Sequence, residues 1–274
     1  MRISSNIDRV AKLVGEEKAV ELFAKAGFDG WDFSMFHMFK DNRSTVEYLR
    51  FARQLKQIGL DNGIVCSQSH APFPVREPAV RARLEDAIAC TAEAGGEICV
   101  IHPDNDKSPE ENAEMYETLL PFARSCGVKI ATENMWNWDH QKDQASFAAC
   151  ATPESFCRHI DILEDDYMVA CLDIGHAEMR GVGTSAVEMI KALDHRLQAL
   201  HIHDNDKWHD SHQLPFTMDI DFVPIAKALK EIGYKGFYTL EVGPYMNVYD
   251  KETVTEGLQN LAAAAKKFAS MCTE

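Results

Sequence analysis

Long apolar runs are missing from this 274-residue sequence, and no stretch approaches the roughly 20 residues that a membrane-spanning helix requires. The first eight residues lack the basic and apolar segments of a signal peptide. No CxxC pair occurs among the eight cysteines, which favours reduced thiols in the core over a structural zinc knuckle. We therefore expect a cytoplasmic protein that has no membrane partner.

Basic residues are few relative to acidic ones. Lys and Arg number 28 against 43 Asp and Glu, so the formal net charge is −15. A field of this sign repels phosphate backbones and anionic membrane surfaces, and we expect no nucleic-acid partner. The hydrophobic share of 46% and the charged share of 26% are those of an ordinary globular protein, which excludes a disordered or fibrous chain.

Short β-branched and apolar runs alternate with longer segments of helical periodicity along the whole chain. We expect strands around residue 3 and over 31–34, 64–67, 98–101, 129–132, 168–172, 199–202 and 237–240. We expect helices over 46–58, 79–94, 109–126, 153–163, 185–193 and 222–232, and an alanine-rich closing helix over 252–271. No linker or low-complexity segment divides the chain, and no GxGxxG follows the first strand. The pattern predicts an α/β protein, a single-domain (β/α)8 TIM barrel over residues 1–274.

Six consecutive predicted strands end in a histidine or an acidic residue. Successive members of this series are 28 to 40 residues apart, the length of one strand–helix unit. In a TIM barrel the carboxyl ends of all strands meet at one face, so these side chains are expected to converge there. Imidazoles and carboxylates without thiolates suit Mn²⁺, Zn²⁺, Co²⁺ or Mg²⁺. The predicted site residues are His70, His102, Glu133, Asp173, His201 and Glu241.

The motifs around these residues occur in the order SQSHAPF, VIHPDN, ATENM, CLDIGH, LHIHDND, DSHQLPF and TLEVG. This set resembles the xylose isomerase-like barrel superfamily, which holds sugar isomerases and epimerases and the endonuclease IV branch of DNA repair. Similarity to the ketose epimerases implies one divalent ion, Mn²⁺ first, with Zn²⁺, Co²⁺ or Mg²⁺ as alternatives. The implied ligands are Glu133, Asp173, His201 and Glu241.

The same resemblance implies contacts with the substrate. His176 would touch it, and Asp139 would bind a hydroxyl or support the ligands from behind. Lys207 stands where the ketose epimerases carry a substrate-binding arginine, so the sequence departs from their pattern at this position.

Similarity to endonuclease IV implies a different metal content, up to three Zn²⁺ ions. The additional ligands of that family's site match His70, His102, His176, Asp210 and His212, and the ligand set alone permits either chemistry. The loops at the predicted mouth, PDNDKSPEEN, NWDHQKDQ and HDNDKWHDSH, carry more acids than bases. Neutralising several phosphates against a net charge of −15 is costly, so the sequence favours a small sugar over DNA.

The favoured function is a metal-dependent isomerase or epimerase acting on a sugar or a sugar phosphate. Glu133 and Glu241 would serve as acid and base on opposite faces of the substrate, while the metal stabilises an enediolate. Arg180 is a candidate phosphate contact. A dehydratase or lyase of a ketose or cyclitol stays open, and a homo-oligomer is implied by the resemblance alone. Candidate apolar walls for the sugar are Trp136, Trp138, Phe73 and Trp31.

The remaining histidines are expected to have no ligand role. His203 lies two residues after His201, so it can share a strand face with it, and we expect it to line the pocket at most. We expect the others to be solvated or on helix surfaces: His37, His140, His159, His195 and His209.

Overall fold

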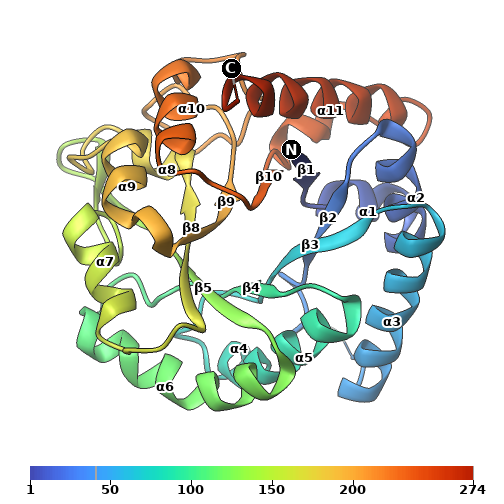
Figure 1. The fold of residues 1–274 in the computed structure, drawn as a ribbon, viewed down its shortest axis with the longest axis horizontal. Helices are drawn as coiled ribbons and strands as arrows, with labels where there is room; N and C mark the ends of the chain where they lie inside the picture. Colours follow the sequence, from blue (N-terminus) through green and yellow to red (C-terminus); the bar gives the residue numbers. More distant parts are fainter. Residues whose placement is uncertain (41, 274) are drawn as a thin grey trace.

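The computed structural model, which describes residues 1–40 and 42–273, contains a barrel of parallel strands inside a ring of helices (Figure 1). The predicted TIM barrel is therefore confirmed, and each predicted strand overlaps an observed one. The barrel strands are β1 (Arg2–Ser5), β2 (Gly30–Ser34), β3 (Val65–His70), β4 (Ile98–Val100), β5 (Lys129–Glu133), β8 (Met168–Asp173), β9 (Leu197–His201) and β10 (Phe237–Leu240).

The barrel closes where the two ends of the chain meet. Six strands form one sheet in the order β2-β3-β4-β5-β8-β9, while β1 pairs in parallel with β10. Parallel bridges between Asn6 and Asp32 and between Ile202 and Leu240 join the two sheets. At the second junction the Ile202 amide donates to the Thr239 carbonyl at 2.9 Å. All the strands thus run in one direction and bring their carboxyl ends to one face.

Helices cover the outside of the barrel, and the closing helix packs beside β1 and α2 (Figure 1). Ser44 and Ser108 each begin a helix with a capping box, made with Glu47 and Glu111. The helices are α1 (Asp8–Val14), α2 (Glu16–Ala26), α3 (Thr45–Asp61), α4 (Pro78–Arg81), α5 (Leu84–Ala94), α6 (Pro109–Cys126), α7 (Pro153–Asp161), α8 (Ile174–Glu178), α9 (Ala186–Leu193), α10 (Phe222–Glu231) and α11 (Val254–Met271), with 3-10 turns η1 (Asp194–Arg196) and η2 (Pro244–Val248).

Helices α1, α2 and α8 form in segments where no helix was expected, and two further local features differ from the prediction. The segment expected as one helix over 79–94 forms α4 and α5, because the Arg83 amide donates to the Val80 carbonyl in a tight turn that ends the first helix. The loop after β5 contains an unpredicted antiparallel hairpin, β6 (Trp136–Asp139) and β7 (Gln144–Phe147). The Asp139 carboxylate accepts from the Gln141 and Lys142 amides at the turn of this hairpin.

The main hydrophobic core lies between the strands and the helices, and a smaller apolar cluster is formed by residues of β4, β5, β8 and β9. Trp31 is 0% exposed and belongs to the main core, so the prediction that it forms a wall of the substrate pocket is wrong. The eight cysteines are free thiols and six of them are buried, as expected. Among residues 1–40 and 42–273, no helix is long and apolar enough to cross a membrane.

Candidate metal centre

Four strand-end side chains form a compact group at the carboxyl face of the barrel. The ligand atoms of Glu133, Asp173, His201 and Glu241, which we call the central group, all lie within 4.8 Å of one another. His201 Nδ1 is 3.2 Å from Glu133 Oε2 and 3.4 Å from Glu241 Oε2. Ligands about 2 Å from a shared ion stand roughly 3–4 Å apart, so this spacing suits a single divalent cation.

A second group shares Glu133 with the first. His102 Nε2 lies 3.2 Å from Glu133 Oε2, and His70 Nε2 lies 2.9 Å from His102 Nε2. Burial and the neighbouring charge of His102 lower the pKa of His70 well below its ordinary value. His70 is therefore neutral at pH 7 and can offer a nitrogen lone pair to a cation.

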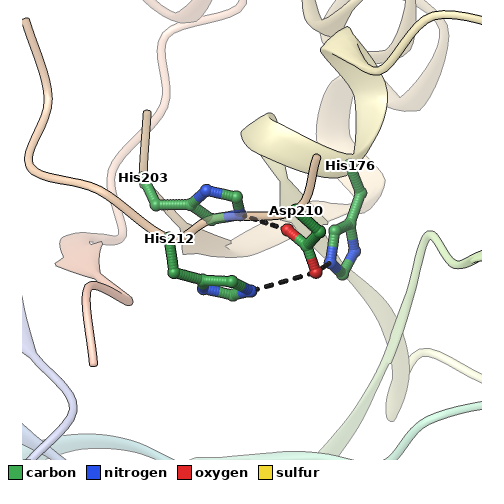
Figure 2. Close-up of side chains that lie close together, drawn as sticks. All are labelled: His176, His203, Asp210 and His212. Atoms are coloured by element: carbon green, nitrogen blue, oxygen red, sulfur yellow. Dashed lines mark hydrogen bonds and ion pairs between the residues drawn. The ribbon is translucent and has the colours of Figure 1, made fainter. Parts of the chain in front are cut away.

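Asp210 is the centre of a third group, which we call the outer group (Figure 2). Its Oδ2 atom lies 3.2 Å from Nε2 of both His176 and His212, and its Oδ1 atom lies 3.5 Å from Nε2 of His203. Figure 2 shows the carboxylate between the three imidazole rings. Burial would lower the pKa of His212, but the Asp210 carboxylate outweighs it and raises that pKa to about 9.

His203 is a site residue that sequence reasoning missed. It is 0% exposed, and its Nε2 atom lies 3.0 Å from Asp173 Oδ1, so it connects the central group to the outer group. We expected His203 to line the pocket at most, but it belongs to a group of side chains with the spacing of metal ligands. The available signal was its spacing of two residues from His201, which places both rings on one face of the extended chain.

Several buried polar atoms of these groups have no hydrogen-bond partner among the described residues. An unsatisfied buried polar group costs about 1–3 kcal/mol, and more if it is charged. Bound cations would satisfy these atoms, and histidine nitrogens with carboxylate oxygens are suitable donors for a divalent transition metal. The residues present therefore fit such an ion. The unpartnered site atoms are Glu133 Oε2, Asp173 Oδ2, His201 Nδ1 and Nε2, His203 Nε2 and Asp210 Oδ1.

The charges at the site keep its acidic ligands ionised. Burial would raise the pKa of Glu133, but His201 and His102 outweigh it and hold that pKa well below the ordinary range. Burial would likewise raise the pKa of Asp173, but His176 and His203 lower it. Both carboxylates are therefore anionic at neutral pH, which is the form that binds a cation.

Asp32, in the middle of β2, supports the central group from behind. Its Oδ2 atom lies 3.7 Å from His201 Nε2, on the side of the ring opposite Glu133, and it accepts a 3.1 Å hydrogen bond from Gln68. Both Asp32 and His201 are fully buried. A carboxylate behind a ligating imidazole fixes the ring orientation and its tautomer.

We expect Asp32→Asn to weaken metal affinity by about 10- to 100-fold, the usual cost of losing such a partner. Competition with a coloured chelator measures this affinity directly. Asp29→Asn, just before the same strand, is the matched control, because Asp29 bonds the Ile3 amide and has no contact with His201. Equal affinities for the two variants would show that Asp32 does not orient the ligand.

Gly175, in α8, is required by the position of His203. A Cβ atom at Gly175 would lie 1.9 Å from His203 Cε1. We expect Gly175→Ala to displace the ring, to destabilise the fold by about 1–3 kcal/mol and to lower the metal content of the outer group. Thermal unfolding and metal analysis measure the two effects. The double variant Gly175→Ala/His203→Ala should regain stability but not metal, and a single variant of unchanged stability would contradict the expectation.

A cavity of about 500 Å³ opens over the three groups, a size suited to a small molecule. Phe73 lines it and stacks on His102 with ring centroids 4.9 Å apart, and Trp136 lines it and donates to Asp210 Oδ2 at 3.4 Å. These two aromatic walls agree with the prediction. The predicted site residues that line the cavity are His70, His102, Glu133, His176, Asp210, His212 and Glu241.

Other predicted contacts lie elsewhere in the described part of the chain. Asp139 stabilises the β6–β7 turn, and Lys207 pairs with Glu178 at 3.1 Å; neither is among the residues that line the cavity. Trp138 and Arg180 also lie outside this lining, and the Arg180 guanidinium stands 5.6 Å from the centre of the Trp208 ring.

His159 differs from its prediction as a solvated or helix-surface residue. It is 2% exposed, its Nδ1 atom lies 2.7 Å from the Ser155 carbonyl oxygen, and the Asn112 amide lies 3.3 Å from its Nε2 atom. It is buried between α6 and α7, so that prediction is wrong, although it contacts none of the three groups. The other four histidines of this set are exposed, as expected: His37, His140, His195 and His209.

The chain is similar over most of its length to a known protein family. The family model described as xylose isomerase-like TIM barrel matches residues 20–264. An uncharacterized protein of Methanocaldococcus jannaschii is 27% identical over 241 residues, which cover 81% of this chain and 78% of that protein.

Solved structures with the same fold include sugar epimerases. D-psicose 3-epimerase, solved in the presence of D-fructose, has a TM-score of 0.75 at 15% identity, with 100% of both chains covered. A D-tagatose 3-epimerase-like protein has a TM-score of 0.73 at 20% identity over 98% of both chains. The IolI protein with a bound zinc atom has a TM-score of 0.75 at 19% identity over 98% of both chains. At these identities the likeness establishes the fold.

Proposed function

Because the chain belongs to the xylose isomerase-like TIM-barrel family, we propose that it is a divalent-metal-dependent isomerase or epimerase of a sugar. The observation that carries the proposal is the position of two glutamates, Glu133 and Glu241, which belong to one ligand group and both line a cavity of a size suited to a small sugar. The sugar epimerases among the structures of the same fold support this substrate class.

The central group would bind the metal ion. Glu133, Asp173, His201 and Glu241 would hold one ion, which acts as a Lewis acid toward the carbonyl oxygen of the substrate. Mn²⁺ is the ion we propose first; Zn²⁺ has the support of the zinc atom in the IolI structure.

Proton transfer is the task of the two glutamates. The Glu241 side chain is 12% exposed and held by Asn6 at 3.4 Å, whereas Glu133 is 1% exposed. Glu241 takes the proton from the carbon next to the carbonyl, and the C–H electron pair enters the carbon–carbon bond of an enediolate. In an isomerisation Glu241 returns the proton to the neighbouring carbon. In an epimerisation Glu133, which is anionic in the resting site, would first take up a proton from solvent and then deliver it to the opposite face, while Glu241 passes its proton to solvent.

The test is deuterium incorporation from D₂O into a panel of ketoses and aldoses, with and without a phosphate group, using protein loaded with Mn²⁺, Zn²⁺, Co²⁺ or Mg²⁺. We expect exchange at the carbon next to the carbonyl of at least one sugar, followed by the isomer or epimer. Product analysis separates these outcomes from loss of water or carbon–carbon cleavage, which would indicate a dehydratase or lyase. No exchange with any sugar and metal would overturn the proposal.

A second candidate is a three-metal phosphodiesterase, and the structure provides a specific reason to test it. The group of His70, His102 and Glu133 and the outer group add two sites of ligand-like spacing beside the central one. The net charge of −15 opposes a DNA substrate. Cleavage of an abasic-site oligonucleotide at physiological salt, with three zinc ions per chain, would favour this function over sugar isomerisation.

A further inference from the structure

We propose that Arg9, assisted by Lys12, forms a subsite for an anionic group on the substrate. This inference rests on the proposed function and narrows its substrate to a sugar that carries a phosphate, or another anion, away from the carbonyl end. Both residues lie in α1, directly after β1, and both line the cavity. A guanidinium binds phosphate oxygens through two parallel hydrogen bonds, and an ammonium adds a point charge.

Arg9 has no acidic partner within the described chain. No carboxylate oxygen of residues 1–40 and 42–273 lies within 4.0 Å of its guanidinium nitrogens, and it is the only arginine among them that lines the cavity. Arg2, Arg50, Arg76, Arg81 and Arg180 likewise have no carboxylate oxygen within this distance in the described chain, but none of them lines the cavity. The remaining arginines are each paired with an acid: Arg43–Glu16, Arg53–Glu93, Arg83–Asp86, Arg124–Asp165, Arg158–Glu110 and Arg196–Asp161.

The neighbours of Arg9 hold its side chain at the cavity wall. A Cβ atom at Gly243 would lie 3.3 Å from Arg9 Cγ. Because this residue, which follows β10, is a glycine, the aliphatic part of the Arg9 side chain can pack against its backbone. Lys12 is kept beside it by Asp8, whose Oδ2 atom lies 2.7 Å from Lys12 Nζ. Arg9, which has no acidic partner, and Lys12, which is paired with Asp8, therefore line the same cavity as residues of the three acidic and histidine-rich groups.

The arrangement fits a substrate with two chemically different ends. Asn6, three residues before Arg9, reaches Glu241 Oε1 at 3.4 Å, so the segment that carries the cations also contacts the central group. The carbonyl and hydroxyl oxygens of a sugar would occupy the metal end, while its anion would meet Arg9. A neutral sugar has no group that needs an unpaired guanidinium. Arg180, the residue that the sequence suggested for a phosphate, is stacked near Trp208 outside the cavity lining.

Binding of inorganic phosphate tests the subsite without turnover. We expect Arg9→Gln to weaken phosphate binding to the metal-loaded protein at least tenfold, by titration calorimetry at constant ionic strength. Arg9→Lys should retain part of the affinity, and Arg50→Gln, on the exposed surface of α3, should retain all of it. Phosphate bound only by metal ions would survive in Arg9→Gln, and this result would overturn the proposal. An acetate arm distinguishes the anion: loss of acetate binding alone would assign the subsite to a sugar acid.

Substrate kinetics separate this inference from the proposed function. For a phosphorylated substrate, Arg9→Gln should raise KM about 100-fold or more while kcat changes little, and for the neutral parent sugar KM should stay the same. Turnover of a phosphorylated sugar with a KM that Arg9→Gln leaves unchanged would overturn the subsite and leave the isomerase. Arg9-dependent phosphate binding without exchange into any sugar would overturn the isomerase and leave the subsite.

Discussion

Glu241→Gln is expected to lower deuterium exchange into the substrate by about 10³-fold or more, since a glutamine amide cannot accept the proton that the reaction removes. Glu241 is the more exposed of the two glutamates and lines the cavity, so it is best placed to reach the substrate carbon. The measurement is the initial rate of solvent-proton exchange at saturating metal, with the metal content of the variant determined in parallel.

The control for this variant is Glu178→Gln. Glu178 is a carboxylate near the site that pairs with Lys207 and accepts from the Ala186 amide, outside the cavity lining. Its replacement should leave the exchange rate within a few-fold of the parent. An active Glu241→Gln protein would show that another group removes the proton. If the variant is inactive but has also lost its metal, the experiment is repeated with Glu241→Asp, which keeps a carboxylate ligand but moves the base away from the substrate carbon.

Metal removal is the second change with a large expected effect. The buried unpartnered atoms of the site include anionic oxygens of Glu133 and Asp173. A cation therefore binds the folded chain more tightly than the unfolded chain, and this difference raises the free energy of unfolding. At a metal concentration 1,000 times Kd this linkage is worth about 4 kcal/mol, or a rise in Tm of roughly 10 °C for a chain of this size. Calorimetry of the chelator-treated and reloaded protein measures it.

The control for metal removal is Glu133→Gln, since Glu133 belongs to two of the groups. This variant should show a much smaller rise in Tm at the same metal concentration. Sodium at equal ionic strength should have no effect on either protein. Equal Tm values with and without divalent metal would show that the clustered side chains do not form a metal centre. The number of ions bound separates the central group alone, at one per chain, from the three-group arrangement.

The sequence was sufficient to predict that residues at the strand ends converge, because a TIM barrel brings the carboxyl ends of all its strands to one face. Glu133, Asp173 and His201 each end a strand, and a barrel brings such residues together whatever the loops do. The prediction of convergence therefore depended only on finding the strands and their order. The helix caps at Ser44 and Ser108 are likewise local features, since a serine three residues before a glutamate forms a capping box that satisfies free amides at the start of the helix.

Features that depend on contacts between distant segments could not be predicted. Asp32 is a polar residue inside an apolar strand, and its role appears only when His201, 169 residues away, is placed behind it. Arg9 is one of many charged helix residues until Gly243 is known to lie against it. Lys207 stands where the resemblance implied a substrate-binding arginine, but its side chain pairs with Glu178. Contacts between segments that are far apart in the sequence decided these three outcomes.

The pairing of β1 with β10 has a consequence for how the protein acquires its site. Arg2 and Phe237 are register partners 235 residues apart, and closing a loop of that length costs roughly 5 kcal/mol of chain entropy. This entropy is lost before a contact of such long range adds any stability, which makes contacts of this kind slow to form. The bond from Asn6 to Glu241 and the packing of Arg9 on Gly243 cross this same junction, so the cavity is completed only when the two ends of the chain meet. A ligand bound in this cavity would therefore stabilise the junction that closes the barrel.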